Sequence, residues 1–362
     1  MRNATKILVR CPNWIGDQVL AYPFFFALRK IYPHATIAAV CRPWVRSIQF
    51  QGQVDQVFEL PRSGGLVELY RNAREIRAAG PWDLAISLPN SFSAALHLFL
   101  TGAKTRIGYA FDGRSFLLTT RLPWDDRREL HRSQAYLNLL GDAGAEAVKN
   151  LPATRFFGAL PENPLDQKTP GVLEIFEGKK EWMPKGGLPE GLKPGEPYVV
   201  FAPGATAESR RWSTESFSAL AGLIQEKWKY AVVVVGGKAE KPLAQQMVAR
   251  AGEGRIIDWT DRGGVSDLYS VFNQARFTVC NESGLAHVSA LSGAMTQIVC
   301  GAADPRRTQP IGPGKVQVSF NPVECWPCEK NVCLQQGDKK IQCLRGISPE
   351  GVFQEIQRGL EA

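Results

Sequence analysis

Short apolar runs alternate with longer amphipathic stretches along both halves of the chain. In the first half this pattern predicts strands over residues 6–10, 36–41, 54–60 and 83–88, with helices over 17–32, 66–79 and from about 91. In the second half it predicts strands over 198–202, 231–235, 256–259, 277–280 and 296–300, with helices over 214–228, from about 239, and over 349–360. Strands that alternate with helices indicate an α/β fold, in which parallel sheets carry helices on both faces.

A proline-rich stretch interrupts the alternation between residues 160 and 197 and indicates a linker. The chain of 362 residues is also longer than a usual single domain. We therefore predict one domain over residues 1–180, a second over 181–347 and a closing helix within 348–362. Two doubly wound units of this kind place a cleft between them, and ligands bind at the carboxyl ends of their parallel strands.

The chain is basic, with a net charge of +8 and an isoelectric point of about 9.1. This charge favours anionic partners such as nucleotide phosphates, nucleic acid or an anionic membrane surface, although general solubility explains it equally well. No zinc-finger, homeodomain or RNA-recognition signature occurs, so we expect no nucleic-acid partner.

Apolar runs are short throughout the sequence. None approaches the roughly 18 residues that cross a bilayer, and the run near the N-terminus is too short for the core of a signal peptide. We therefore predict a cytoplasmic protein, with peripheral contact through its basic surface to the inner membrane as an additional candidate property.

The loop after the first strand carries a candidate catalytic acid. Residues 11–17 read Cys-Pro-Asn-Trp-Ile-Gly-Asp, in which Gly16 permits a tight turn. Asp17, where the helix begins, can accept a proton from an incoming hydroxyl, while capping of the helix is the structural alternative. The loop lacks the glycine spacing of a dinucleotide fingerprint or a P-loop, which argues against a dehydrogenase and a kinase.

Loops of the second half offer groups suited to phosphate. The loop over residues 202–212 carries the hydroxyl of Thr206 and the guanidinium groups of Arg210 and Arg211, whose forked donors match phosphate oxygens. A solvated turn with surface arginines is the alternative. The loop over residues 236–240 has the glycines of an ordinary turn after a strand. Lys238 or Glu240 in this loop can also reach a ribose hydroxyl.

The loop over residues 281–287 opens a helix, where free backbone N–H groups form an anion site. Gly284 lets a diphosphate approach closely, and His287 lies about one turn further on, where it can face a ligand. A lone histidine is more often structural, but this one follows a polar turn that contains glycine.

The eight cysteines divide into two groups. The scattered ones lie in or beside apolar strands and are expected to be buried thiols, namely Cys11, Cys41, Cys280 and Cys300. The clustered ones are Cys325, Cys328, Cys333 and Cys343. This cluster fits a tetrahedral Zn²⁺ site or an Fe–S ligand set, although its spacing matches neither usual pattern. Free thiols or disulfides are the alternatives, and disulfides are disfavoured in the cytosol.

Taken together and in order, these loops resemble glycosyltransferase family 9, which includes the lipopolysaccharide heptosyltransferases. The resemblance covers nearly the whole chain. It rests on Pro-Asn-Trp-Ile-Gly-Asp ending at Asp17, on the runs at 88–96 and 105–109, on Pro-Gly-Ala at 203–205 with Arg-Trp at 211–212, and on Glu-Ser-Gly-Leu-Ala-His at 282–287. Each piece alone is common, and the ordered set is specific for the family.

The resemblance implies the GT-B architecture, in which an N-terminal Rossmann-like domain holds the acceptor and a C-terminal one holds the donor. It also implies inverting transfer of heptose from an ADP-sugar to the lipopolysaccharide inner core without a catalytic metal, with Asp17 as the general base. The candidate donor-binding residues are Thr206, Arg210, Arg211, Lys238, Glu240, Glu282, Ser283, Gly284 and His287. For an anionic acceptor the candidates are Asn13, Asn90, Arg42, Arg62, Arg106, Arg114 and His131, although solubility explains most arginines equally well.

One position departs from the family pattern. The donor motif usually begins with aspartate, whereas this chain has Glu282, whose extra methylene moves the carboxylate by more than a bond length and puts donor geometry or identity in question. Three alternatives stay open: a family 9 transferase with a UDP- or GDP-sugar, a nucleotide-sugar epimerase, which can share the two-domain fold, and a non-catalytic module that binds nucleotide or glycan. An epimerase needs no acceptor, and a binding module would tolerate the loss of Asp17.

Overall fold

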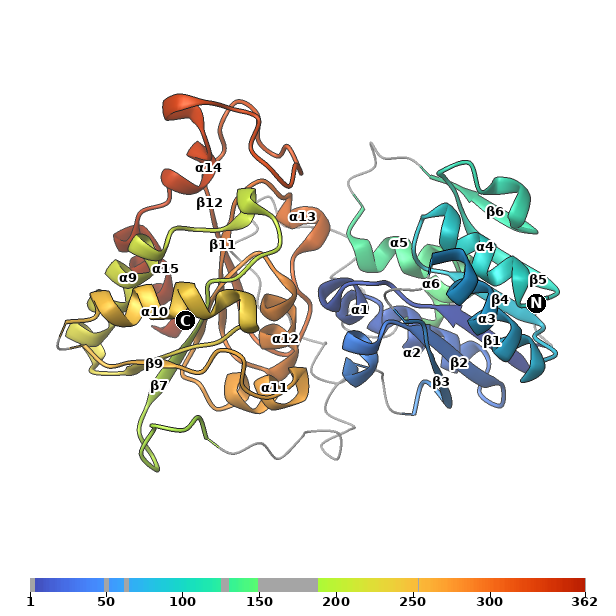
Figure 1. The fold of residues 1–362 in the computed structure, drawn as a ribbon, viewed down its shortest axis with the longest axis horizontal. Helices are drawn as coiled ribbons and strands as arrows, with labels where there is room; N and C mark the ends of the chain where they lie inside the picture. The colour runs from blue at the N-terminus through green and yellow to red at the C-terminus, as the bar shows by residue number, and fades with distance from the viewer. Residues whose placement is uncertain are drawn as a thin grey trace. The chain divides into compact units, whose positions relative to one another are not determined.

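The computed structural model describes residues 4–48, 52–61, 65–124, 130–148, 188–252 and 254–361. The chain forms two compact units, Met1–Phe157 (unit 1) and Gly158–Ala362 (unit 2), each with its own sheet (Figure 1). The domain boundary predicted at residue 180, and most of the predicted linker, lie outside the described residues. No helix within the described ranges is long and apolar enough to cross a bilayer.

Unit 1 contains a parallel sheet of six strands in the order β3-β2-β1-β4-β5-β6. The strands are β1 (Lys6–Arg10), β2 (Thr36–Cys41), β3 (Gln56–Glu59), β4 (Leu84–Ser87), β5 (Thr105–Ala110) and β6 (Thr120–Pro123). The first four confirm the predicted strands, two of them at the predicted bounds. The apolar pattern did not predict β5 and β6, because these strands carry threonine, arginine and glycine between few apolar residues.

The helices of unit 1 are α1 (Ile15–Leu20), α2 (Tyr22–Ile31), α3 (Gly65–Ala78), α4 (Phe92–Leu100), α5 (Arg132–Asn138) and α6 (Asp142–Val148). The single helix predicted over residues 17–32 is wrong, since the chain breaks at Ala21 into α1 and α2. Pro23 explains the break: it has no amide hydrogen to donate within a continuous helix, and it is tolerated only in the first turn of a new one.

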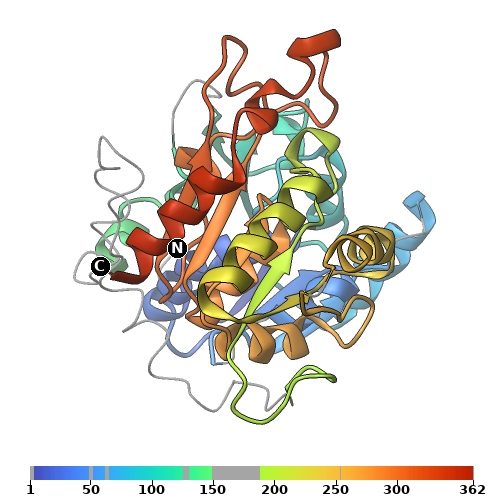
Figure 2. The same cartoon turned by 90° about the vertical axis from the view of Figure 1, so that its left-hand side faces the viewer.

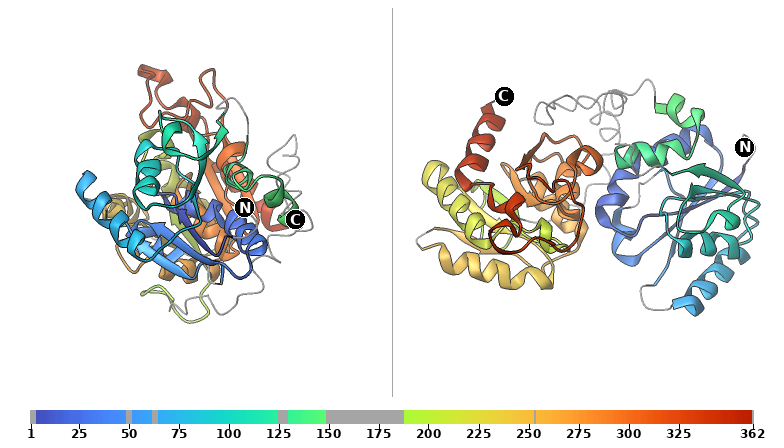
Figure 3. Two further views of the ribbon diagram at one scale, coloured as in Figure 1. Left: turned by 90° about the vertical axis from the view of Figure 1, so that its right-hand side faces the viewer. Right: turned by 90° about the horizontal axis from the view of Figure 1, so that it is seen from above.

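Helices cover both faces of the unit 1 sheet. On one face, Ile76 of α3 and Leu98 of α4 pack with the buried Trp82 against strand residues such as Leu8. Figure 3 shows α3 and α4 side by side. A separate apolar cluster joins α2, α5 and α6 through Ala27, Leu137 and Val148. Burial on both faces explains why β1, β2 and β4 read as continuous apolar runs.

Unit 2 repeats this topology with strands in the order β12-β11-β10-β7-β8-β9, again all parallel. The strands are β7 (Tyr198–Ala202), β8 (Ala231–Val234), β9 (Ile256–Asp258), β10 (Thr278–Asn281), β11 (Thr296–Cys300) and β12 (Val316–Phe320). The five predicted strands of the second half are confirmed to within a residue at each end, and β12 was not predicted.

The helices of unit 2 are α9 (Thr214–Trp228), α10 (Lys241–Arg250), α11 (Val265–Asn273), α12 (Gly284–Ser292), α13 (Pro305–Thr308), α14 (Gln342–Arg345) and α15 (Pro349–Glu361). The closing helix is confirmed as α15, and Ser348 caps it by accepting the N–H of Gly351 at 3.1 Å. Figure 2 shows α9 and α15 lying side by side on one face of the sheet, where Phe217 and Ile356 share one core.

Both sheets therefore have the order 3-2-1-4-5-6 when their strands are counted from the start of each unit. In such a sheet the chain turns in opposite directions after the first and the fourth strand, and the crevice between those two strand ends is where ligands bind. In unit 1 this switch point lies between β1 and β4, and in unit 2 it lies between β7 and β10. The loops at 11–17 and 88–91 meet at the first switch point, and the loops at 202–212 and 281–287 meet at the second.

Candidate active site

A buried asparagine joins the two switch-point loops of unit 2. The Asn281 side chain has no exposed surface; its Nδ2 donates to the Pro203 carbonyl at 2.6 Å, and its Oδ1 accepts the N–H of Trp212 at 3.0 Å. Both ends of the loop over residues 203–212 are thus tied to the end of β10. Sequence reasoning did not single out Asn281, although a polar residue that ends an apolar strand was a usable signal.

Arg210 and Glu282 form an ion pair across this switch point. Arg210 Nη1 donates to Glu282 Oε1 at 3.2 Å, and Thr308 Oγ1 lies 3.4 Å from the same oxygen. The Glu282 side chain is 9% exposed and that of Arg210 is 29% exposed, so the pair lies at the edge of the solvent. The Nε of Arg210 is buried and makes no hydrogen bond within the described part of the chain.

The predicted partners Thr206 and Arg211 lie on the same loop. Arg211 turns back on the loop, donating from Nε to the Ala205 carbonyl at 2.5 Å and from Nη2 to the Thr206 carbonyl at 3.1 Å. Thr206 is exposed. Arg211 therefore stabilises the loop that presents Thr206 and Arg210, instead of presenting all its donors to a ligand.

Glu240 packs over the glycines of two neighbouring strand ends. Its Oε2 accepts the N–H of Gly237 at 2.8 Å. A Cβ added to Gly204 would lie 2.4 Å from Glu240 Cγ, and one added to Gly236 would lie 2.6 Å from Glu240 Cβ. These glycines are therefore required for the close approach of the two loops, while Lys238 in the same turn is exposed.

The helix α12 begins beside this group. Its N-cap residue Ser283 makes no side-chain cap, and Ser283 Oγ has no hydrogen-bond partner among the residues that the structure describes. Gly284 is the first residue of the helix, and His287 is buried one turn later, with 6% of its surface exposed. The structure thus brings together an uncapped helix N-terminus, glycine and a charged pair, a combination suited to a diphosphate.

In unit 1, Asp17 lies in the first turn of α1 but does not cap it, since the N-cap is Trp14. Its carboxylate is half-buried and forms an ion pair with Arg132 of α5, with Asp17 Oδ1 3.8 Å from Arg132 Nε. Tyr136 lies one turn further along α5, where burial raises its pKa well above the usual value and the charge of Asp17 adds to the rise. A partly exposed carboxylate that is held in position by a neighbouring cation is a suitable proton acceptor.

Arginines organise the loop that leads to Asp17. The Oδ1 of Asn13 accepts from Arg10 Nη2 at 2.7 Å and from Arg42 Nε at 3.4 Å. Arg42 also donates to the Leu60 carbonyl at 3.2 Å. Burial lowers the pKa of Arg10 to about 10, which marks it as a structural cation. The predicted acceptor residues Asn13 and Arg42 are thus engaged in holding the loop after β1.

The second switch-point loop of unit 1 closes around Arg114, whose side chain has no exposed surface. Arg114 Nη2 donates to Asn90 Oδ1 at 3.2 Å, Nη1 donates to Ser87 Oγ at 3.1 Å, and Nε donates to the Tyr109 carbonyl at 2.9 Å. Burial lowers the pKa of Arg114 to about 10. Arg114 thus shapes the loop that carries Asn90, and its contact with the acceptor stays a prediction.

Two other predicted acceptor residues also have structural partners. Arg106 donates to the Leu117 carbonyl at 2.8 Å and to the Ala103 carbonyl at 2.6 Å. His131 is buried and caps α5 by accepting the N–H of Ser133 at its Nδ1, at 3.4 Å. Arg62 lies outside the described residues. In unit 1, sequence reasoning missed Arg132, which has no sequence signal because α5 itself was not predicted.

The scattered cysteines are buried free thiols, as predicted, with 1% or less of each residue exposed. In the C-terminal cluster all four cysteines are also free thiols, and Cys343 is the buried one. Burial raises the pKa of Cys343, and the charges of Cys328, Cys333 and Cys325 add to the rise, so Cys343 lies within electrostatic reach of the other three. The Ile341 N–H donates to Cys333 Sγ at 3.3 Å.

Two Rossmann-like units, each with a six-stranded parallel sheet and polar loops at its switch point, form the GT-B architecture, and the arginine- and glycine-bearing loops of unit 2 suit a diphosphate. Residues 69–338 match the family described as glycosyltransferase family 9 (heptosyltransferase). The chain belongs to this family and is a transferase enzyme.

Its relatives include heptosyltransferases 2. The chain is 25% identical to lipooligosaccharide heptosyltransferase 2 of Haemophilus ducreyi over 98% of this chain and 99% of that protein. It is 27% identical to lipopolysaccharide heptosyltransferase 2 of Salmonella typhimurium, covering 84% and 85%. The solved structure of E. coli ADP-heptose LPS heptosyltransferase II superposes with a TM-score of 0.71 at 23% identity, covering 98% of each chain, which establishes the shared fold.

Proposed function

We propose that this protein transfers a heptose from ADP-heptose to the inner core of lipopolysaccharide, as its relatives named heptosyltransferase 2 do to lipopolysaccharide or lipooligosaccharide. The observation that carries the proposal is the Arg210–Glu282 pair beside the uncapped start of α12, at the switch point of unit 2. In this assignment unit 2 binds the donor and unit 1 binds the acceptor. Thr206, Arg210 and the N-terminus of α12 bind the diphosphate, while Glu282 and His287 orient the sugar.

Asp17 is proposed as the general base. Its carboxylate accepts the proton of the acceptor hydroxyl as that oxygen forms a bond to the anomeric carbon of the heptose. The bond from that carbon to the diphosphate breaks on the opposite face, ADP leaves with the electron pair, and the configuration inverts. Arg132 holds the carboxylate in place, and the donors of unit 2 stabilise the negative charge on the leaving ADP.

The experiment that tests this assignment replaces Asp17 by asparagine. General-base assistance contributes about 10²–10⁴-fold, so Asp17→Asn should lower kcat by at least about 100-fold and leave the Kd for ADP unchanged. Asp142→Asn is the matched control, because Asp142 is an exposed aspartate in the first turn of α6 in the same unit. Near-normal turnover of Asp17→Asn would remove Asp17 from the role of base.

The donor is the point on which the remaining alternatives differ. Binding of ADP, but not of UDP or GDP, supports an ADP-sugar, whereas a preference for UDP or GDP supports a family 9 transferase with another donor. Release of ADP from ADP-heptose only when lipopolysaccharide acceptor is present separates transfer from epimerisation. The reaction is proposed to need no catalytic metal, so turnover should persist in the presence of a chelator.

The acceptor is proposed to lie on unit 1 near Asp17, with the protein in peripheral contact with the cytoplasmic face of the inner membrane. Exposed aromatic side chains support such a contact, since Phe92, Phe111 and Phe116 are 38%, 44% and 71% exposed and Phe92 packs against Phe116 with ring centroids 6.1 Å apart. Vesicles that contain anionic lipid should retain the protein at low salt and release it at high salt.

The cysteine cluster is proposed to hold a structural Zn²⁺ or Fe–S group. Thiolate ligands and the N–H···S bond at Cys333 suit such a group. Within the described ranges, however, no three ligand side chains converge in metal-binding geometry, so binding requires the cysteine side chains to draw together. Protein purified without chelator should contain about one metal equivalent, which Cys343→Ser should lose. Absence of metal from the wild-type protein would contradict the proposal.

A further inference from the structure

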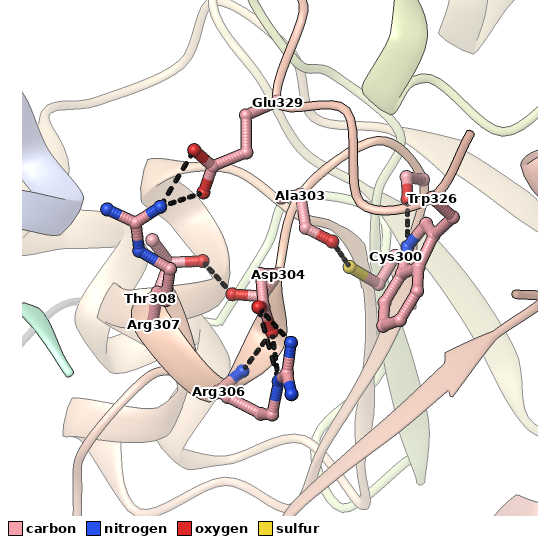
Figure 4. A network of polar contacts seen from close by, with 9 residues as sticks. Cys300, Ala303, Asp304, Arg306, Arg307, Thr308, Trp326 and Glu329 are labelled. Atoms are coloured by element: carbon pink, nitrogen blue, oxygen red, sulfur yellow. Dashed lines mark hydrogen bonds and ion pairs between the residues drawn. The ribbon is translucent and has the colours of Figure 1, made fainter. Parts of the chain in front are cut away.

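Residues 326–331 lie between Cys325 and Cys333 of the C-terminal cysteine cluster and include Cys328. They form neither helix nor strand, but they make specific contacts. Their first contacts are with the loop between β11 and α13, drawn in Figure 4. Trp326 Nε1 donates to the Gly301 carbonyl at 2.9 Å, and the Glu329 N–H donates to the Ala302 carbonyl at 2.8 Å. Arg307 of α13 pairs with both carboxylate oxygens of Glu329, at 3.1 and 3.0 Å.

The same segment contacts the turn that carries Arg210. Ser209 Oγ donates to the Lys330 carbonyl, and the Ser209 N–H donates to the Asn331 carbonyl at 3.3 Å. The carbonyl of Ser209 in turn accepts the N–H of Ala302 at 3.2 Å. Gly301 makes this junction possible, because a Cβ there would lie 2.2 Å from the Ser209 carbonyl oxygen. Ser209 is buried, with 2% of its surface exposed.

The turn at residues 208–210 and helix α13, which are held in this way, carry two groups that contact Glu282. Arg210 follows Ser209 directly and donates to Glu282 Oε1 at 3.2 Å. Thr308 follows Arg307 directly, and its hydroxyl lies 3.4 Å from the same oxygen. A displacement of residues 326–331 would therefore move two groups that contact the Glu282 carboxylate.

We propose that residues 326–331 are a positioning element for the donor site, acting on Arg210 through Ser209 and on Glu282 through the Glu329–Arg307 pair. This inference rests on the proposed binding of the donor to unit 2. It assigns residues 326–331 a function in donor binding. This function depends on their contacts with Ser209 and Arg307, and not on the cysteine thiols or on a metal bound to them. Ser209 and Glu329 are positioning residues, because each acts on the donor through a neighbour.

The test compares two variants with matched controls. Ser209→Ala removes a hydroxyl bond to a backbone carbonyl, and Ser218→Ala removes one of the same kind within α9, where Ser218 Oγ donates to the Thr214 carbonyl at 2.7 Å. Glu329→Gln weakens a partly exposed ion pair to arginine, and Glu190→Gln weakens the exposed pair with Arg262. The readouts are the Kd for ADP by calorimetry, the split of kcat from donor KM, and Tm.

Ser209→Ala and Glu329→Gln should weaken ADP binding or donor kcat/KM by about ten- to a hundredfold, because catalytic geometry is sensitive to displacements near 1 Å. Their Tm should match that of their controls, and the controls should bind ADP as the wild type does. Faster hydrogen exchange over residues 203–212 in Ser209→Ala alone would locate the change in the donor loop.

Donor parameters equal to those of the controls in both variants would overturn the inference. If Ser209→Ala does not fold, Glu329→Gln decides, since its side chain is 41% exposed and its loss does not threaten the core. A wild-type protein that binds no ADP would instead overturn the proposed donor, and hydrogen exchange over residues 203–212 would still test whether residues 326–331 hold that loop.

Discussion

At the scale of single residues, the candidate site is built from side chains whose partners come from distant parts of the chain. Glu282 precedes α12, Arg210 follows β7 and Thr308 ends α13, yet all three meet at one carboxylate oxygen. Asp17 meets Arg132 in the same way. Sequence patterns identified Arg210, Glu282 and Asp17 but missed Thr308 and Arg132, because a local pattern contains no information on the partner.

The unusual glutamate at position 282 leads to a prediction. Glu282→Asp shortens the side chain by one methylene and opens the 3.2 Å contact with Arg210 Nη1. We expect donor kcat/KM to fall by up to about 100-fold, measured with ADP-heptose, while Tm changes little. Glu215→Asp in α9 is the control, since Glu215 also pairs with an arginine, Arg250. Equal or higher activity of Glu282→Asp would mean that the site is not adapted to the longer side chain.

At the scale of elements, the loops at the ends of parallel strands were predictable and the connections between helices were not. The strands β1, β2, β7 and β11 appear at their predicted bounds because they are buried on both faces and read as continuous apolar runs. The hydrogen bond that links α3 to α4 has no such signal in the sequence. There, the buried His97 Nε2 donates to Asn72 Oδ1 at 3.1 Å.

The buried His97 that joins α3 to α4 predicts that unit 1 is sensitive to acid. Burial, with the charges of Arg10 and Arg42, lowers the pKa of His97 from 6.5 to about 3, so the unfolded chain binds this proton at a higher pH than the folded one does. Stability is therefore lost as the pH falls below the unfolded pKa, by about 2 kcal/mol between about pH 7 and pH 5.

Urea unfolding of wild type, His97→Gln and His34→Gln at these two pH values measures the effect. His97→Gln should lose most of the pH dependence of unit 1, whereas His34→Gln should keep it, because His34 is an exposed histidine of the same unit. An unchanged dependence in His97→Gln would show that other groups cause the acid sensitivity.

At the scale of the whole molecule, two units of the same sheet order carry different chemistry at equivalent switch points. Unit 1 presents a carboxylate steered by Arg132, and unit 2 presents arginine and a helix N-terminus. Since the donor is proposed to bind the arginine and helix N-terminus of unit 2, ADP should stabilise unit 2 and leave the intrinsic stability of unit 1 unchanged.

Calorimetric unfolding tests this expectation. ADP at about 100 times its Kd should add roughly 2.7 kcal/mol to the transition of unit 2, which hydrogen exchange over residues 198–361 would locate. UDP and GDP at the same concentration are the controls for the nucleotide. A shift confined to unit 1 would contradict the assignment of the donor to unit 2.

The sequence by itself determined the class of fold, most strands, the polar loops that follow them and the family, because periodic burial and local loop chemistry are written in neighbouring residues. The tertiary structure decided the strand order that brings those loops together, the burial of Arg114 and the contacts of residues 326–331. These features depend on which distant segments pack together, and the free energy of that packing is shared among residues that no local pattern connects.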